Sequence, residues 1–188
     1  MTMKLNAVKR TSLKKSDVKK IRRSGGVPGI LYSRGRDAEP IFIQEAEFST
    51  AVRTIPPGQL STKAFTLVFG SKERKAIVKD IHYEPTTYIV SHLDFEELLE
   101  DVPVVVRVPI ACTGVAECMG VKQMGGVLRQ VTRHVQIRCL PRDIPSEFSV
   151  DVADLGMRQS RRLEDLTFPP QITPLTPLKE VLVVVAKR

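Results

Sequence analysis

Cysteine and histidine are scarce in this chain: 188 residues include three of each. Cys112, Cys118 and Cys139 are odd in number and form no Cys-x-x-Cys pair, which argues against a disulfide framework and against a zinc site. We therefore expect buried, inert thiols. The sequence predicts neither a bound metal nor a cofactor.

Long apolar runs are also missing. The longest, Val102–Ile110 and Val181–Ala186, are too short or too interrupted to span a bilayer. The N-terminus carries charge with no apolar signal-peptide stretch behind it. We expect a cytoplasmic protein without a membrane partner.

Catalytic motifs are weak. The segment Gly25-Gly26-x-x-Gly29 lacks the Gly-Lys-Ser/Thr ending of a P-loop and follows an expected helix, so it predicts no nucleotide site. His92-x-Asp94 has a spacing found in some metal-dependent phosphoesterases, and Asp80-Ile81-His82 offers the one other candidate pair. Further ligand clusters are missing, which disfavours a hydrolase. No enzyme activity and no small-molecule substrate are predicted.

The positive charge, by contrast, is abundant and local. The first 36 residues hold six Lys and five Arg against the single acid Asp17, so they carry ten net positive charges while the rest of the chain sums to −2. Such a concentration is typical of a surface that binds a phosphate backbone, although a solvated tail is the simpler alternative.

Apolar spacing in this basic segment favours structure over a tail. Val18 and Ile21 lie three residues apart behind Ser16-Asp17, which predicts a helix with Ser16 as N-cap. The basic residues expected on or beside one face of this helix are Lys15, Lys19, Arg22 and Arg23. A nucleic acid is the first partner to consider.

Short runs rich in Val, Ile and Thr, separated by 13 Pro and 11 Gly, predict a mostly β protein with a few short helices. Glu45–Arg53 is an expected helix, and Gly70-Ser71 an expected hairpin turn. The strands expected in the first part are Leu5–Lys9, Gly29–Ser33, Pro40–Gln44, Ala64–Phe69, Lys75–Ile81 and Tyr88–Phe95.

An acidic cluster marks an expected boundary between domains 1–95 and 96–188. Its members are Glu96, Glu97, Glu100 and Asp101. Beyond it we expect the strands Val104–Val108 and Val181–Ala186, and a hairpin after Gly125-Gly126. In that hairpin Val135, Ile137 and Cys139 alternate with His134, Gln136 and Arg138.

His92 and Asp94 belong to one of the expected strands, so they share one face while Leu93 and Phe95 point to the other. A surface His and Asp are commonly just solvated. A carboxylate beside a phosphate-binding surface weakens non-specific binding, however, which suggests that Asp94 accepts hydrogen bonds from base amino groups such as cytosine N4.

The order of motifs along the chain resembles a known family. Arg22-Arg23-x-Gly25-x-Val27-Pro28-Gly29-Ile30-Leu31-Tyr32 is similar to the Arg-x-x-Gly-x-(Val/Ile)-Pro-(Ala/Gly)-x-x-Tyr signature of the bacterial large-subunit ribosomal protein "twenty-five" family, which binds 5S ribosomal RNA. The later matching segments are Lys79-Asp80-Ile81, His92-Leu93-Asp94-Phe95, 121–128, 139–145, Val150-Asp151-Val152 and Asp165-Leu166-x-x-Pro169. Length and the second domain resemble the CTC form, named after general stress proteins.

The resemblance implies a β-barrel domain that binds 5S RNA, followed by a β-rich domain that this binding does not need. It also implies contacts with the loop-E region of 5S RNA by Arg10, by Arg22 or Arg23, and by Tyr32, His92 and Asp94. Ser33 departs from the family, where many members have Gly, which bears on the turn geometry.

The sequence thus predicts a structural constituent of the large ribosomal subunit, with 5S rRNA, other rRNA and neighbouring ribosomal proteins as partners. Two alternatives stay open. One is a detached tRNA-binding module resembling the anticodon-binding barrel of glutaminyl-tRNA synthetase. The other is a stress-related factor that binds proteins through its second domain.

Overall fold

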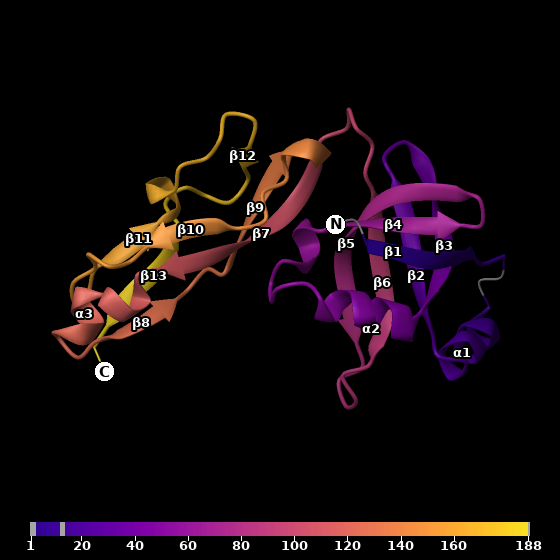
Figure 1. The fold of residues 1–188 in the computed structure, drawn as a ribbon, viewed down its shortest axis with the longest axis horizontal. Helices are drawn as coiled ribbons and strands as arrows, with labels where there is room; N and C mark the ends of the chain where they lie inside the picture. Colours follow the sequence, from indigo (N-terminus) through magenta and orange to yellow (C-terminus); the bar gives the residue numbers. More distant parts are fainter. Residues whose placement is uncertain (1–2, 12–13, 188) are drawn as a thin grey trace. The chain divides into compact units, whose positions relative to one another are not determined.

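The computed structural model describes residues 3–11 and 14–187, and its chain is divided into two compact units, Met1–Val102 and Pro103–Arg188. Strands predominate in both units, which confirms the mostly β class (Figure 1). Among the described residues, no helix is both long and apolar enough to cross a membrane.

The first unit is a closed barrel with two helices. Its strands are β1 (Met3–Lys9), β2 (Gly26–Ser33), β3 (Arg36–Gln44), β4 (Ala64–Phe69), β5 (Lys72–Tyr83) and β6 (Val90–Glu97). Its helices are α1 (Lys15–Arg23), α2 (Glu45–Arg53) and the short 3-10 turn Leu60–Thr62.

The barrel closes in the order β1-β3-β2-β6-β5-β4, with β1 and β4 pairing in parallel. Strand β6, the last in sequence, lies between β2 and β5. The interior is apolar because alternate strand residues point inward. Leu5, Ile41, Phe65, Leu93 and Phe95 are among its fully buried side chains.

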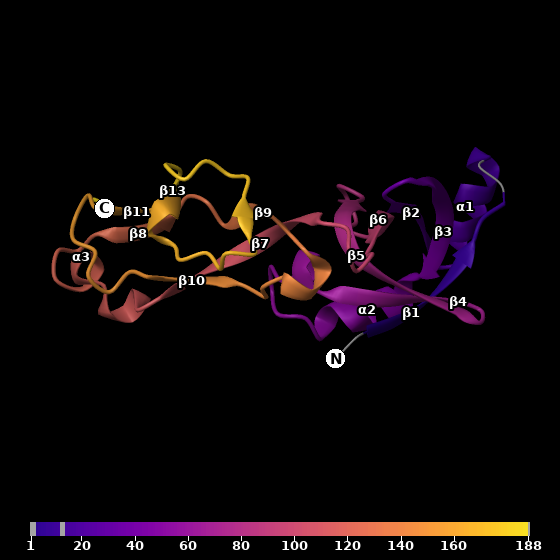
Figure 2. The same ribbon diagram turned by 90° about the horizontal axis from the view of Figure 1, so that it is seen from above.

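Helix α2 lies beside β1 in both views (Figures 1 and 2). Phe48 is its buried residue and joins the barrel core. Glu47 accepts hydrogen bonds from the backbone N–H and the side-chain amide of Asn6 on β1, both at 3.0 Å. This helix has the bounds that the sequence predicts.

Several strands are longer than predicted because backbone pairing continues past the apolar runs. The turn at Gly70-Ser71 is confirmed: Phe69 pairs with Lys72, and Gly70 has a φ of +61° that glycine adopts without steric cost. The start of β6 was predicted wrongly. Tyr88 lies in a turn with a φ of 55°, and its N–H donates to the Glu84 carbonyl at 2.9 Å.

The predicted N-cap of α1 is also wrong. Lys14 takes the cap position with an extended backbone, and its carbonyl accepts from the N–H groups of Asp17 and Val18. Ser16 lies inside the first turn, where its hydroxyl is 3.5 Å from a carboxylate oxygen of Asp17. The helix therefore begins without a side-chain cap.

The second unit contains two small sheets, ordered β10-β7-β9-β12 and β11-β13-β8. Its strands are β7 (Val104–Thr113), β8 (Val127–Gln130), β9 (His134–Cys139), β10 (Phe148–Asp151), β11 (Ser160–Arg162), β12 (Thr173–Pro174) and β13 (Val181–Ala186). The helical segments are α3 (Met119–Lys122) and the 3-10 turns Val115–Glu117, Pro141–Asp143 and Leu163–Asp165.

The hairpin predicted after Gly125-Gly126 does not form. Strand β8 pairs with β13, whereas β9 pairs with β7 and β12, so both strands find distant partners. The pairing of β9 with β7 places Ile137 opposite Val106, and both side chains are buried. The alternation within β9 is confirmed, with Val135, Ile137 and Cys139 inward.

Two members of the acidic cluster belong to a barrel strand. Glu96 and Glu97 lie within β6, where Glu97 is 8% exposed with an oxygen 3.8 Å from the Arg74 guanidinium.

All three cysteines are free, with Cys118 and Cys139 buried and Cys112 half-buried. Burial, followed by the charge of Asp143, raises the pKa of Cys139 to about 11, so this thiol is inert.

Candidate nucleic-acid interface

Helix α1 presents a dense group of cations to solvent. Its exposed basic residues are Lys15, Lys19, Lys20, Arg22 and Arg23. The other face holds the half-buried Val18 and Ile21. Ile21 packs on Gly26 at the start of β2, where an added Cβ would lie 2.7 Å from the Ile21 side chain. The glycine thus allows the helix to pack closely against the barrel.

Arg22 connects this helix to β6. Its Nη2 donates a hydrogen bond of 2.9 Å to the carbonyl of Ser91, the residue before His92. The cationic helix and the strand that carries the His-Asp pair are therefore parts of one surface.

Arg10 directly follows β1, and its backbone N–H donates to the Pro40 carbonyl at 2.8 Å. Its Nε is buried and has no hydrogen-bond partner among the described residues. Burial and then the positive charge of Arg22 lower the pKa of Arg10, so the two guanidinium groups repel each other. A phosphate oxygen would satisfy the unpaired donor and relieve this repulsion.

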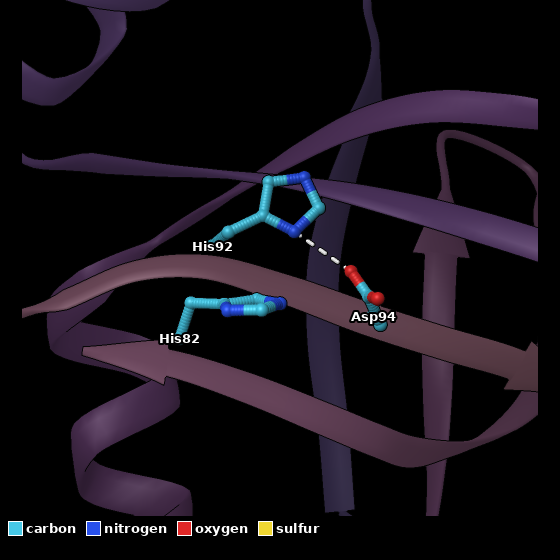
Figure 3. A group of neighbouring side chains, drawn as sticks. All are labelled: His82, His92 and Asp94. Atoms are coloured by element: carbon cyan, nitrogen blue, oxygen red, sulfur yellow. Dashed lines mark ion pairs between the residues drawn. The ribbon is translucent and has the colours of Figure 1, made fainter.

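His92 and Asp94 lie on the outer face of β6, and the alternation predicted for this strand is confirmed. Leu93 and Phe95 are 0% exposed, whereas the side chains of His92 and Asp94 are 25% and 29% exposed. His92 Nδ1 lies 2.7 Å from Asp94 Oδ1, an ion pair when the imidazole is protonated (Figure 3). Asp94 Oδ1 is buried and has no hydrogen-bond partner among the described residues, so this carboxylate can accept a hydrogen bond from an external donor.

Tyr32 lies on β2 beside these groups, since Tyr32 pairs with Glu96 and Ile30 with Asp94 in the parallel register of β2 and β6. Burial raises the pKa of Tyr32 to about 12, with further contributions from the negative charges of Glu96, Asp94 and Asp80. Its hydroxyl therefore stays protonated at neutral pH and can donate as well as accept a hydrogen bond.

The shifted pKa makes Tyr32 a spectroscopic probe of this face. We expect the difference between the alkaline ultraviolet titrations of the wild type and Tyr32→Phe to show a midpoint near pH 12 rather than the ordinary 10.0. Because the folded state keeps this proton longer than the unfolded state, its stabilising effect is present below pH 10 and is lost between about pH 10 and 12. Asp94→Asn should lower the midpoint by removing one negative charge. A midpoint near 10 would contradict the environment described here.

The residues that the sequence predicts for RNA binding all lie in the first unit, most of them in one connected group. Arg10 and Arg22 interact electrostatically, and Arg22 reaches the strand that carries His92 and Asp94. Lys15, Lys19 and Arg23 join this group through helix α1, whereas Tyr32 lies beside it on β2.

Sequence reasoning missed the pairing of the two candidate His/Asp motifs. In the antiparallel register of β5 and β6, His82 is opposite His92 and Asp80 is opposite Asp94. Aligning the two strands about their connecting turn would have indicated this pairing. The role of Ser91, in contrast, depends on a backbone carbonyl and leaves no signal in the sequence.

Two family models together match nearly all of the chain. The model of the Ribosomal L25p family matches residues 5–95, and the model of "Ribosomal protein TL5, C-terminal domain" matches residues 103–188. The barrel with its basic surface and the second β-rich unit thus have the two-part organisation of a class of ribosomal proteins.

Full-length relatives narrow this class. The protein named Large ribosomal subunit protein bL25 in Chlamydia muridarum (strain MoPn / Nigg) is 46% identical over 186 residues, which cover 99% of this chain and 100% of the relative. The proteins of the same name in Chlamydia trachomatis serovar L2 (strain ATCC VR-902B / DSM 19102 / 434/Bu) and Chlamydia pneumoniae are 45% and 44% identical with the same coverage. The chain belongs to the bL25 family, in its two-domain CTC type. This confirms the resemblance found in the sequence and the prediction of a structural, non-enzymatic protein.

Proposed function

We propose that this protein is a structural constituent of the large ribosomal subunit and that it binds the loop-E region of 5S rRNA through its basic N-terminal surface. The protein would be located in the cytoplasm as part of the ribosome, where it would contact other rRNA and ribosomal proteins. Family membership supports the assignment to the large subunit. The surface chemistry supports the RNA contact.

One observation carries the RNA assignment. The hydrogen bond from Arg22 to Ser91 joins the cation-rich helix α1 to the outer face of β6. Groups that attract any phosphate backbone thereby lie next to a His-Asp pair that can read base edges. A protein that selects one RNA needs both kinds of contact.

The residues would divide the work as follows. Arg10 and Arg22 would share a phosphate, and Lys15, Lys19 and Arg23 would add contacts to the backbone. Asp94 would accept hydrogen bonds from a base amino group, with His92 bonding to or stacking on the same nucleotides. Tyr32 would contribute its protonated hydroxyl or stack on a base.

The second unit would not be required for this contact. We propose the division made from the sequence, with residues 1–95 binding 5S rRNA and residues 96–188 serving another role on the ribosome. A truncated chain for testing it should extend to Val102, because β6 continues to Glu97 and the first compact unit ends at Val102.

Competition between RNAs tests the proposal directly. Labelled 5S rRNA bound to the full chain should be displaced by unlabelled 5S rRNA and far less readily by tRNA. The chain ending at Val102 should show the same preference. If tRNA competed equally well, the 5S assignment would fail and the detached tRNA-binding module would become the better description.

A lysine on the helix tests the backbone contacts. Lys19→Ala should weaken binding to cognate and non-cognate RNA by a similar factor, because an ammonium meets phosphates that all RNAs share. In salt titrations, the slope of log affinity against log salt should become shallower by about 0.7 to 0.9 for the lost contact. Lys63→Ala, at the residue directly before β4, is the control and should leave the slope unchanged. A cognate-only loss for Lys19→Ala would contradict the backbone role.

A further inference from the structure

The outer face of the β5–β6 hairpin brings together three side chains with metal-ligating atoms. One ligand atom each from His82, His92 and Asp94 can be chosen so that all three lie within 4.8 Å of one another (Figure 3). His82 comes from β5 and the other two from β6, and the antiparallel register places the two histidines directly opposite each other. Their ring centroids are 6.0 Å apart.

This grouping stands out because histidine is rare in the chain. Two of the three histidines meet here, while His134 lies on β9 of the second unit. Two further carboxylates lie beside the cluster: Asp80 is opposite Asp94 in the register, and Glu96 follows two residues later on the same strand. Arg22 reaches the other end of this face at Ser91, where its guanidinium is held by the Ser91 carbonyl. Lys79 Nζ lies 2.7 Å from a carboxylate oxygen of Glu96, so the charge of this carboxylate is already balanced by an ion pair.

The geometry is within reach of a tetrahedral ion. Ligands bound to zinc at 2.0–2.1 Å lie about 3.3 Å apart, so the present arrangement has to contract by roughly 1.5 Å at its widest. The His82 side chain is exposed, so its ring can rotate toward the pair on β6. His92 Nδ1 and Asp94 Oδ1 lie 2.7 Å apart, so one ion can be bound by both atoms after a small outward adjustment.

We propose that His82, His92 and Asp94 form a binding site for one divalent transition-metal ion of the Zn²⁺ type. Two imidazoles and a carboxylate suit zinc, cobalt or nickel, whereas Mg²⁺ prefers oxygen ligands alone. The site leaves at least one coordination position open to water.

Occupancy of this site would regulate RNA binding, and this second step rests on the proposed function. His92 and Asp94 cannot ligate the ion and contact a base with the same atoms. Metal and cognate RNA should therefore weaken each other's binding, with the same coupling factor in both directions.

Metal binding is measured on the RNA-free full chain by calorimetry with Zn²⁺ and by visible absorption with Co²⁺. We expect one ion per chain, and no comparable binding of Mg²⁺. His82→Ala should lower the affinity by at least about tenfold, because losing even a group that only orients a metal ligand costs about 10- to 100-fold. His134→Ala, the matched control, should leave the affinity unchanged.

Three results would overturn the metal site: no binding of Zn²⁺ or Co²⁺ by the wild type, equal losses in His82→Ala and His134→Ala, or a sulfur-to-cobalt charge-transfer band showing that the cysteines hold the ion. Circular dichroism checks that His82→Ala stays folded, and His82→Gln provides a second variant of similar size. None of these measurements requires RNA, so their failure is distinguishable from a failure of the proposed function.

The coupling is tested with 5S rRNA. Zn²⁺ should lower the RNA affinity of the wild type but leave that of His82→Ala nearly unchanged, because this variant has lost one ligand of the ion. Without zinc the two proteins should bind RNA equally well, since His82 is not among the residues assigned to the RNA contact. An equal effect on both proteins would place the action of zinc on the RNA itself and would overturn the competition.

Discussion

Asp94→Asn should lower the affinity for cognate 5S rRNA by about 5- to 150-fold, corresponding to about 1–3 kcal/mol for one base contact. The substitution turns one carboxylate oxygen into an amide donor, so a base amino group loses its acceptor. It also removes a negative charge next to the RNA phosphates. Binding to non-cognate RNA should therefore be no weaker than in the wild type. Filter binding with 5S rRNA and tRNA in parallel measures both.

His92→Ala should follow the same cognate-only pattern if the imidazole contacts the same nucleotides. Glu73→Gln is a suitable control, because it removes a charge from β5 where Glu73 pairs with Lys4 on the exposed surface. If Asp94→Asn changed neither the cognate affinity nor the ratio of cognate to tRNA binding, the His-Asp pair would be an ordinary solvated face. Base reading would then move to Tyr32.

Raising the salt concentration from about 50 to 200 mM should weaken RNA binding by roughly 50- to 150-fold, if about four phosphates are neutralised. The reason is the release of counterions from the RNA by Arg10 and the cations of helix α1. Each neutralised phosphate contributes about 0.7 to 0.9 to the slope of log affinity against log salt. Titrating the full chain against 5S rRNA at several salt concentrations gives this slope.

Arg22→Ala should make the slope of log affinity against log salt shallower by about 0.7 to 0.9, the contribution of one phosphate contact. It should also weaken the preference for cognate RNA, because Arg22 donates a hydrogen bond to Ser91 on β6. Arg53→Ala is the control, since Arg53 lies at the exposed end of α2. A response that is flat in salt would exclude the basic surface as the main contact.

Local patterns predicted most of the first unit. The apolar runs gave the strand positions, and the alternation of Leu93 and Phe95 with His92 and Asp94 correctly placed two buried and two partly exposed side chains. These features depend on the alternation of apolar and polar residues along each strand, which can be read directly from the sequence.

Pairings between distant segments could not be predicted in this way. The β8–β9 hairpin was inferred from the nearby pair Gly125-Gly126. Strand β8 instead pairs with β13 and strand β9 with β7, because burying apolar side chains against these distant strands stabilises the fold more than a local hairpin would. The unpaired Nε of Arg10 and the contact of Arg22 with a backbone carbonyl also arise only when β1, α1 and β6 meet. Such contacts leave no periodic signal.

The central position of β6 sets an order of events during protein synthesis. Helix α1 and its cations leave the ribosomal tunnel early, but β2 and β5 have no strand between them until residues 90–97 have emerged. At roughly 5–20 residues per second, a nascent chain exists for seconds with charge but without the His-Asp pair. During this time it can attract any RNA and distinguish none, and two unpaired strand edges are open to aggregation. Completion of a single strand ends both hazards at once.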